Sequence, residues 1–371
     1  MKNVKILDKG CICRNPEYIF GYTAWPSVER LPDGTLIAVA SGMRMSHLCF
    51  SGKTTMHISR NDGKTWLGPI IVNDTPLDDR DAGILHLGGS KLLLTWFNLE
   101  IKYLDRYIRA RESLSDQQKA FFDAATMNYT DELNAKHAGS FCRLSEDGGV
   151  TWGEPHRLPV TAPHGPAKLR DGRLLILGKD FINKEPIGDG GAIYACASSD
   201  EGATWETLAA IPLPEGTHNN NYFEPHVIEL PDGKLIGHIR YQHAEGYRNH
   251  EPFTIFQTES TDGGNTWTEA KDLGCCGSPP HLIQHSSGAL VCVYGRRKEP
   301  FGESAMISRD GGQTWDMDYI IDTDAPSGGL GYPASVELAD HSILTVYYQK
   351  PAENEPCTLM YTRWELPGKE G

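Results

Sequence analysis

The sequence predicts an all-β fold, a six-bladed β-propeller of four-stranded antiparallel blades that forms one domain over residues 1–371. Three observations predict it. A Ser-x-Asp/Asn-x-Gly-x-Thr-Trp phrase occurs five times, a phrase with a tight turn between apolar runs occurs six times, and the two alternate along the chain. Self-similarity at a roughly regular period indicates a repeat architecture, and small antiparallel sheets repeated around a ring form a β-propeller.

The first phrase has the composition of a hairpin turn followed by a strand. An Asp or Asn side chain bonds to its own backbone and sets a tight turn, while the glycine takes the positive φ that other residues resist. The Thr-Trp pair favours a strand and supplies a large apolar ring for packing. The five copies are Ser59–Trp66, Ser145–Trp152, Ser198–Trp205, Ser260–Trp267 and Ser308–Trp315.

The second phrase is a turn between two apolar runs, strongest where it contains Asp-Gly, and it predicts a second hairpin in each unit. Its six copies are Leu31–Leu36, Leu87–Leu92, Leu169–Leu174, Leu230–Leu235, His285–Leu290 and Leu338–Ile343. Two hairpins make a four-stranded blade. The sixth unit lacks the first phrase, so we expect the N-terminal stretch Val4–Cys13 to complete that blade and close the ring.

Blade two carries an insertion. The first two copies of the Trp-ending phrase lie much farther apart than any later pair, and the excess falls between about residues 100 and 136. It includes Tyr103–Ala110 and Gln117–Phe122, which combine helix formers with a helical apolar spacing, and Ser113 or Ser115 is placed to cap its second half. We expect a helical insertion on one rim, either a lid over a site or a contact of a homo-oligomer.

Composition limits the partners and the compartment. The formal net charge of −14 argues against a nucleic-acid partner, and it requires that any acidic substrate be met by local arginines. No stretch approaches the roughly 18 apolar residues of a membrane span. The first residues lack the apolar core of a signal peptide, and the nine cysteines include no C-x-x-C pair. We therefore expect a cytoplasmic protein with reduced thiols, no metal site, no cofactor and no membrane partner.

A ligand site is expected at one mouth of the central channel, because the innermost strands line the channel and loops cluster at the start of these strands. Counting nine residues back from each turn glycine, or its equivalent, aligns the six inner strands. The residues found there are Trp25, Arg80, Pro163, Glu224, Pro279 and Tyr332. A ring with an arginine, a glutamate, a tyrosine and a tryptophan indicates a binding site rather than a plain channel lining.

The first phrase resembles the Asp-box of the sialidase (neuraminidase) superfamily, whose members are six-bladed propellers, and the resemblance covers nearly the whole chain. It implies a tyrosine nucleophile, which resembles Tyr332 in Gly-Tyr-Pro-Ala, assisted by a glutamate, which resembles Glu224 in Phe-Glu-Pro-His. It also implies arginines that clamp a substrate carboxylate, and these resemble Arg240 and Arg297, or the neighbouring Arg296. Because a tyrosine hydroxyl has a pKa near 10, it needs a base within reach, and guanidinium groups bind carboxylates bidentately.

Two positions depart from the family pattern. Where the family has its first arginine, two residues before Pro26, this chain has Ala24. Where the family has its acid/base aspartate, this chain has a loop without Asp, in which His47 falls at about that place. The clamp must therefore be rebuilt or absent, and the proton donor is either His47, which titrates near neutral pH, or another aspartate.

The remaining candidates lie on or near the inner strands. In the cluster Asp78-Asp79-Arg80-Asp81, we expect Arg80 to meet a substrate anion or hydroxyl, with Asp79 or Asp81 orienting it or acting as acid or base. Arg44 is a further candidate for the clamp. Trp25 is expected to offer a flat apolar face to a sugar. His164 lies one residue past its ring position and is either a binding residue or a structural histidine.

Three functions fit these residues. The first is a sialidase-like glycoside hydrolase that removes a terminal, acidic sugar with Tyr332 and Glu224, and with His47 or an aspartate such as Asp81 as acid/base. The second is a polysaccharide lyase that abstracts the proton α to a uronate carboxylate with His47 or Tyr332. The third is a carbohydrate-binding propeller without catalysis. The sequence leaves the sugar and its linkage open.

Overall fold

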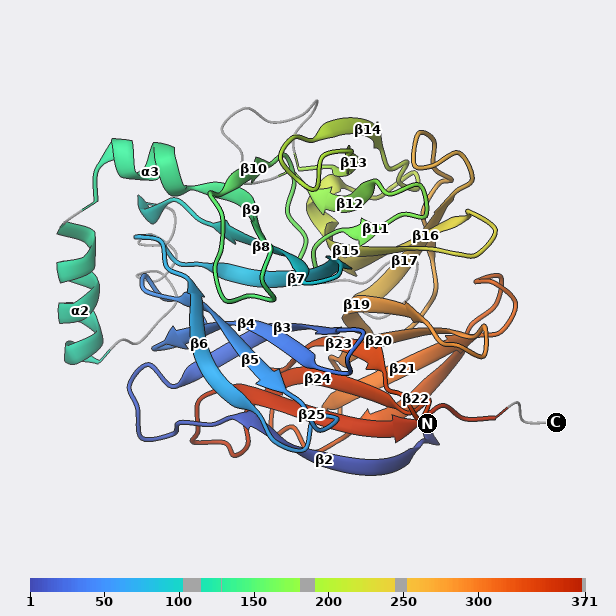
Figure 1. Cartoon of the computed structure of the whole chain (residues 1–371). Coiled ribbons are helices and arrows are strands. Elements are labelled where there is room, and N and C mark those ends of the chain that lie inside the picture. Colours follow the sequence, from blue (N-terminus) through green and yellow to red (C-terminus); the bar gives the residue numbers. More distant parts are fainter. Residues whose placement is uncertain (103–114, 128, 181–190, 244–251, 369–371) are drawn as a thin grey trace.

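Each repeat folds into one twisted antiparallel sheet, and the six sheets follow one another around a ring (Figure 1). This arrangement is seen in a computed structural model that describes residues 1–102, 115–127, 129–180, 191–243 and 252–368. Each innermost strand contacts the innermost strand of the next blade, and that of blade six contacts that of blade one. The predicted six-bladed propeller of four-stranded blades is thereby confirmed.

The strands of each blade are consecutive in the chain, from the channel outward. Blade one comprises β3 (Tyr22–Arg30), β4 (Leu36–Arg44), β5 (Lys53–Ser59) and β6 (Leu67–Asn73), and blade two β7 (Arg80–Gly88), β8 (Lys91–Asn98), β9 (Gly139–Ser145) and β10 (His156–Leu158). Blade three comprises β11 (Ala167–Lys168), β12 (Leu174–Lys179), β13 (Ile193–Ser198) and β14 (Glu206–Ala210). Blade four comprises β15 (Tyr222–Glu229), β16 (Leu235–Gln242), β17 (Phe253–Ser260) and β18 (Lys271–Asp272), preceded by the 3-10 turn η1 (Asn219–Asn221).

The last two blades close the ring. Blade five comprises β19 (Gly277–Gln284), β20 (Leu290–Arg296), β21 (Gly302–Ser308) and β22 (Asp316–Asp322), and blade six β23 (Gly331–Glu337), β24 (Ile343–Gln349) and β25 (Thr358–Glu365). The outer strand of blade six is β2 (Lys5–Cys13), which pairs antiparallel with β25 as predicted. In addition β1 (Lys2–Asn3) pairs parallel with β22, so the N-terminus joins blade five as well.

The five Trp-ending phrases form equivalent turns between the third and fourth strands of blades one to five. In every copy the serine Oγ accepts a hydrogen bond from the amide of the glycine four residues later, at 2.8–3.0 Å. The Asp or Asn Oδ1 accepts one from the threonine amide. The glycine has positive φ, for example 83° at Gly63, which is why no other residue type occupies it in any copy.

The insertion in blade two contains α2 (Asp116–Met127) and α3 (Asp131–His137), which lie at the edge of the ring (Figure 1). Ser115 caps α2, because its Oγ accepts from the Gln118 amide at 3.2 Å while Gln118 accepts from the Ser115 amide at 2.9 Å. The predicted Tyr103–Ala110 portion and Ser113 lie outside the described residues.

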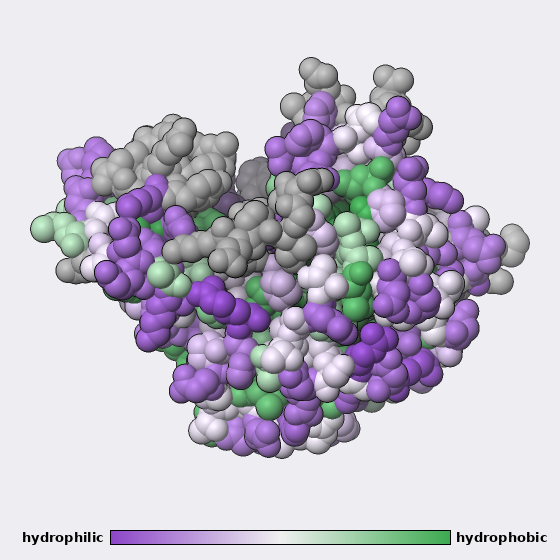
Figure 2. All heavy atoms as spheres, turned by 90° about the horizontal axis from the view of Figure 1, so that it is seen from above, coloured by the Kyte–Doolittle hydropathy of each residue, from purple (hydrophilic) through white to green (hydrophobic). Residues whose placement is uncertain are grey.

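Apolar side chains fill the spaces between neighbouring blades, and hydrophilic ones cover most of the face seen in Figure 2. The core between blades six and one includes Ile12 of β2, Trp25 of β3 and Tyr332 of β23. All nine cysteines are free thiols. None of the helices in the described ranges has the length and apolar character that a bilayer crossing requires.

Candidate active site

A backbone bulge at the start of the inner strands aims side chains at the channel mouth. The pairing register between first and second strands breaks at this place in blades one, two, four, five and six. In four of them the first bulged residue has positive φ, namely Trp25 (54°), Asp81 (48°), Glu224 (47°) and Tyr332 (51°). Positive φ is uncommon outside glycine, and such strain gathers at functional sites. The bulge is therefore a repeated device that turns the side chains inward.

In three blades the residue at the bulge differs by one position from the residue predicted to lie at the channel mouth. In blade two the bulged residue is Asp81 rather than Arg80, since the turn residue equivalent to the other turn glycines is Ser90 and not Gly89. In blade five Ser278 replaces the predicted Pro279, because β19 has one more paired residue after the bulge than β3 has. In blade three the isolated bridge between Thr161 and Lys179 puts Ala162 in place of the predicted Pro163.

The bulged residues of every blade except blade five line a cavity of about 310 Å³ at one mouth of the channel. Of the residues predicted as catalytic, it is lined by His47, Asp81, Glu224 and Tyr332. Of those predicted to bind substrate, it is lined by Trp25, Arg80, Arg240 and Arg297. None of the Trp-ending turns contributes to its lining, so the turns organise the fold and leave this mouth to the inner strands.

Tyr332 of blade six forms a connected group with Glu224 and Arg240 of blade four. The Tyr332 hydroxyl donates to Glu224 Oε1 at 2.6 Å, and Arg240 Nη1 pairs with Glu224 Oε2 and lies 3.2 Å from the Tyr332 oxygen. Burial, and then the negative charge of Glu224, raise the pKa of Tyr332 well above its ordinary value. At neutral pH Tyr332 is therefore a neutral phenol whose proton points at a carboxylate, which is the arrangement that a base-assisted nucleophile needs.

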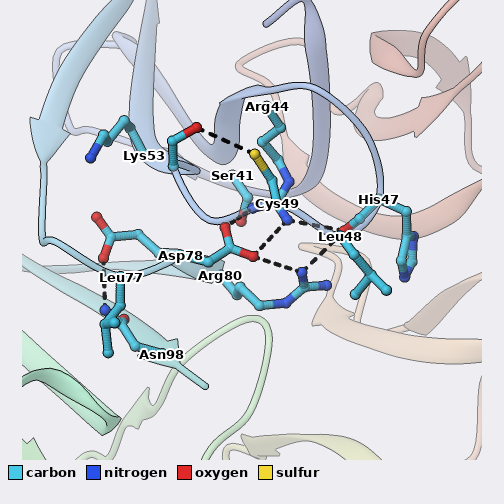
Figure 3. A network of polar contacts seen from close by, with 12 residues as sticks. Ser41, Arg44, His47, Leu48, Cys49, Lys53, Leu77, Asp78, Arg80 and Asn98 are labelled. Atoms are coloured by element: carbon cyan, nitrogen blue, oxygen red, sulfur yellow. Dashed lines mark hydrogen bonds and ion pairs between the residues drawn. The ribbon is translucent and has the colours of Figure 1, made fainter. Parts of the chain in front are cut away.

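A second group holds Arg80 in place (Figure 3). Asp78, which is fully buried, pairs through Oδ1 and Oδ2 with Arg44 and through Oδ2 with Arg80 at 3.0 Å. Both guanidinium groups also donate to the backbone carbonyl of His47, at 3.0 Å from Arg44 and 3.1 Å from Arg80. One carboxylate thus fixes two arginines, and the two arginines fix the loop that carries His47.

Trp25 supports the arginines and does not offer the open face that was expected. The guanidinium carbons of Arg80 and Arg44 lie 4.5 Å and 4.9 Å from its ring centroid, and the His47 ring lies edge-on at 5.0 Å. Only 2% of Trp25 is exposed. Cation–π contacts of this kind stabilise desolvated guanidinium groups, so the role of Trp25 is to seat the cations beside the cavity.

His47 and Asp81 differ in protonation. Desolvation by the surrounding side chains, followed by the charges of Arg80 and Arg44, lowers the pKa of His47 to about 3, with smaller contributions from Arg297 and Arg240, although His47 is itself exposed. Burial raises the pKa of Asp81 to about 7, although Arg80 opposes the rise. Of these two groups, Asp81 is the one that carries a transferable proton near neutral pH. Its backbone amide donates to Ser41 Oγ at 2.8 Å, which holds the bulge in place.

Three predicted residues lie outside the cavity lining. Arg44 is buried behind Arg80. The carboxylate of Asp79 accepts hydrogen bonds from Thr75 and Asn98, so it ties blade two together instead of facing a ligand. His164 lies toward the opposite mouth of the channel, where its Nδ1 is 2.9 Å from Ser27 Oγ.

His164 belongs to a cluster of three buried histidines on neighbouring inner strands. Its ring centroid lies 5.7 Å from that of His226 and 4.9 Å from that of His281. The Nδ1 atoms of His226 and His281 accept hydrogen bonds from the backbone amides of Leu282 and Ser335, so these rings join adjacent blades. In the described part of the chain, no group of three or more His, Cys, Asp or Glu side chains is arranged to hold a metal ion.

Lys179 is a cavity residue that the sequence analysis missed. It is the last residue of β12, and it pairs with Thr161 directly before the bulge, as Arg240 at the same place of β16 pairs with Phe223. A signal was present, because Lys179 and Arg240 follow the turn leucines Leu174 and Leu235 at the same spacing. Both residues lie on the second strand of their blade, which the alignment of the inner strands does not include.

Apolar and aromatic residues complete the lining, and these too were missed. Tyr348 of β24 lies beside Tyr332, with ring centroids 5.9 Å apart. The loop residue Leu48 faces the cavity next to His47. Behind this loop, Phe50 packs edge-on against Phe122 of α2, with centroids 4.8 Å apart. The helical insertion therefore supports one wall of the site from outside.

The comparisons with known proteins agree with this architecture. The profile of the BNR repeat-like domain matches residues 121–346, more than half of the chain. The chain belongs to this family. A protein of unknown function from Dyadobacter fermentans has a similar structure, with a TM-score of 0.75 at 21% identity over 98% of this chain and 99% of that one. Comparison with curated proteins yields no match.

Enzymes of known activity share the fold at lower identity. The NanB sialidase of Streptococcus pneumoniae superposes with a TM-score of 0.63 at 16% identity, over 96% of this chain and 70% of that one. An α-L-arabinanase of Penicillium chrysogenum superposes with a TM-score of 0.57 at 15% identity, over 96% and 98% of the two chains. The chain is thus a BNR-repeat propeller, and solved sialidases and an arabinanase share its fold.

Proposed function

We propose that the protein is a glycoside hydrolase that removes a terminal acidic sugar through a covalent tyrosyl intermediate. The observation that carries the proposal is the Tyr332–Glu224 hydrogen bond of 2.6 Å beside Arg240, on the wall of the cavity. A phenol that is hydrogen-bonded to a carboxylate is an activated nucleophile. The sialidases and the arabinanase with the same fold act on glycans, which supports a carbohydrate substrate.

In the first step the Tyr332 oxygen attacks the anomeric carbon while Glu224 takes the phenolic proton. Asp81 gives its proton to the glycosidic oxygen, and the bond from that oxygen to the anomeric carbon breaks. In the second step Asp81 removes a proton from water, the water oxygen displaces Tyr332, and Glu224 returns the proton to the tyrosine. Two displacements at one carbon retain its configuration. The pKa of Asp81 near 7 suits it to serve as acid and then as base.

The local charge supports an acidic substrate. Arg80, Arg240, Arg297 and Lys179 line the cavity, whereas the chain as a whole carries a net charge of −14. Two of these cations have carboxylate partners, Asp78 for Arg80 and Glu224 for Arg240. Arg297 is held by the backbone carbonyls of Ser278 and Gly328. A positive cavity on an acidic protein favours an anion. In this proposal Arg80 replaces the family's first arginine, at whose position this chain has Ala24.

Turnover of a glycoside panel tests the proposal. The panel contains aryl sialosides, uronides and rhamnosides, and product is followed for wild type, Tyr332→Phe and a control, Tyr348→Phe. Tyr348 also lines the cavity, whereas the hydroxyl that donates to Glu224 is that of Tyr332. We expect an acidic glycoside to be the best substrate and Tyr332→Phe to lower kcat at least roughly 10²-fold, with Tyr348→Phe within a few-fold of wild type. Equal activity of wild type and Tyr332→Phe on that substrate would refute the tyrosine mechanism.

The same panel separates the alternatives. A lyase produces an unsaturated uronate that absorbs in the ultraviolet, so turnover without that absorbance excludes it. The pKa of His47, lowered to about 3, argues against this histidine as a base, because a weakly basic imidazole is a poor acceptor for a carbon-bound proton. A propeller without catalysis would bind sugar in calorimetry and turn over no member of the panel.

A further inference from the structure

Lys179 is a buried cation on the wall of the cavity that the proposed mechanism does not use. It is 3% exposed, and its Nζ donates to the backbone carbonyls of Asn219 at 2.8 Å and Tyr222 at 2.6 Å. The Phe223 ring centroid lies 4.1 Å from the same nitrogen. Within the described ranges no carboxylate lies at ion-pair distance from it. The charge of Glu224 raises the pKa of Lys179 from farther away, against the larger effect of burial. A buried charge without an ionic partner is costly and is typical of a functional site.

The bonds of Lys179 leave part of its donor capacity for a ligand. An ammonium group has three N–H donors, of which two are taken by the carbonyls. Those carbonyls belong to the turn η1 and to the first residue of β15, so the side chain is held across the junction of blades three and four. Such a tether fixes the position of the charge before any ligand arrives, which lowers the cost of binding.

The position of Lys179 in the ring defines which part of a sugar it meets. Lys179 belongs to blade three and Tyr332 to blade six, and in a ring of six these blades face each other. Both residues line the same cavity. A sugar whose anomeric carbon lies at Tyr332 therefore points its opposite end at Lys179, while Arg240 and Arg297 remain on the intervening blades four and five.

We propose that Lys179 is a specificity-determining residue that binds an oxyanion substituent at the end of the sugar remote from the bond to be broken. Sugars with a second negative charge at that end are then preferred over those with one. The inference rests on the proposed function, since it takes Tyr332 as the group at the anomeric carbon. The blade-three counterpart of Arg240 thus supplies a second anion contact across the cavity.

Two open-chain sugar acids that differ in one carboxylate test the inference. Gluconate carries one carboxylate and glucarate carries one at each end of the same carbon chain. Calorimetry at about pH 7 measures their affinities for wild type, Lys179→Met and Lys168→Met. Lys168 is a matched control, because it lines the cavity at the opposite mouth and donates to the Leu87 carbonyl. We expect wild type and Lys168→Met to bind glucarate at least about tenfold more tightly, and Lys179→Met to bind both acids alike.

Wild type alone gives a second measurement that does not depend on how Lys179→Met folds. Burial lowers the pKa of Lys179 to about 8, so at about pH 9.5 the side chain is mostly neutral and the preference for glucarate falls toward one. Equal affinities at neutral pH, or a preference that survives in Lys179→Met or at high pH, would overturn the inference while leaving the proposed function intact. Failure of wild type to bind either acid would instead refute the acidic substrate, and the inference with it.

Discussion

Asp81 and His47 show how one environment shifts an acid and a base in opposite directions. Desolvation disfavours the charged form of each, so it raises the pKa of the buried Asp81 carboxyl and lowers that of the His47 imidazole, which remains exposed. The neighbouring arginines lower both pKa values, which adds to the effect of burial at His47 and opposes it at Asp81. The result is a neutral histidine beside a carboxyl group that titrates near neutral pH.

This difference predicts the pH dependence of catalysis. If protonated Asp81 is the general acid, kcat/KM falls about tenfold per pH unit above about pH 7, because the acid is lost as its carboxyl ionises. Asp81→Asn should lower kcat by roughly 10²- to 10⁴-fold on a substrate with a poor leaving group and should lose this alkaline decline. Rates over a pH series, with Asp79→Asn as control, check it. Asp79 is also buried with a raised pKa, about 6, but lies outside the cavity lining.

Asp79→Asn is the control for the alkaline decline. Asp79→Asn should keep the alkaline decline of wild type, since Asp79 bonds to Thr75 and Asn98 instead of facing the cavity. A decline that persists in Asp81→Asn would assign the acid to another group. At the residue scale, the alignment of the inner strands and the family resemblance pointed to Tyr332 and Glu224 as candidates. They left the acid open between His47 and an aspartate, because pKa values depend on burial that no motif records.

At the scale of elements, the start of β7 and the loop after β4 are joined through one carboxylate. Asp78 precedes β7, Arg44 ends β4, and the His47 carbonyl belongs to the loop between β4 and β5 (Figure 3). The sequence marked this region as its densest charge cluster, but it could not say which carboxylate pairs and which faces the site. Which carboxylate faces the site depends on the alternation of side chains along the strand and on the bulge. A bulge of one residue reverses the direction of every side chain beyond it.

Replacing this carboxylate should weaken both the fold and the site. Asp78→Asn leaves two buried guanidinium groups without their shared counterion, which costs about 3–5 kcal/mol of unfolding free energy. Because Arg80 and the His47 loop lose their anchor, KM for an acidic substrate should rise at a temperature where the variant is still folded. Denaturant titration and steady-state kinetics measure both effects. Asp74→Asn is the control, since Asp74 forms an exposed pair with Lys53 and its loss should change neither quantity appreciably. An Asp78→Asn variant as stable as wild type would contradict this account.

At the scale of the molecule, the repeats allow most of the architecture to be predicted and hide the exceptions. Every turn phrase is local, so its hairpin follows from its own residues. Ring closure by Val4–Cys13 follows from the absence of the Trp-ending phrase in the sixth unit. The additional pairing of β1 with blade five could not be predicted, because two residues carry no strand signal. The position of Lys179 opposite Tyr332 follows only once the six blades are placed in a ring.

The closure itself is testable with two isoleucines of the same strand. Ile12 of β2 is 9% exposed and packs between blades six and one, whereas Ile6 is 43% exposed. Ile12→Ala should lower the free energy of unfolding by about 2 kcal/mol or more, because it removes buried methyl groups from the core that joins the ends of the ring. Ile6→Ala should have a much smaller effect. Denaturant unfolding followed by tryptophan fluorescence compares them. Since each blade packs on two neighbours, the loss should shift one cooperative transition of the whole protein. A separate early transition, with the main one unmoved, would mean that β2 frays independently and does not close the ring.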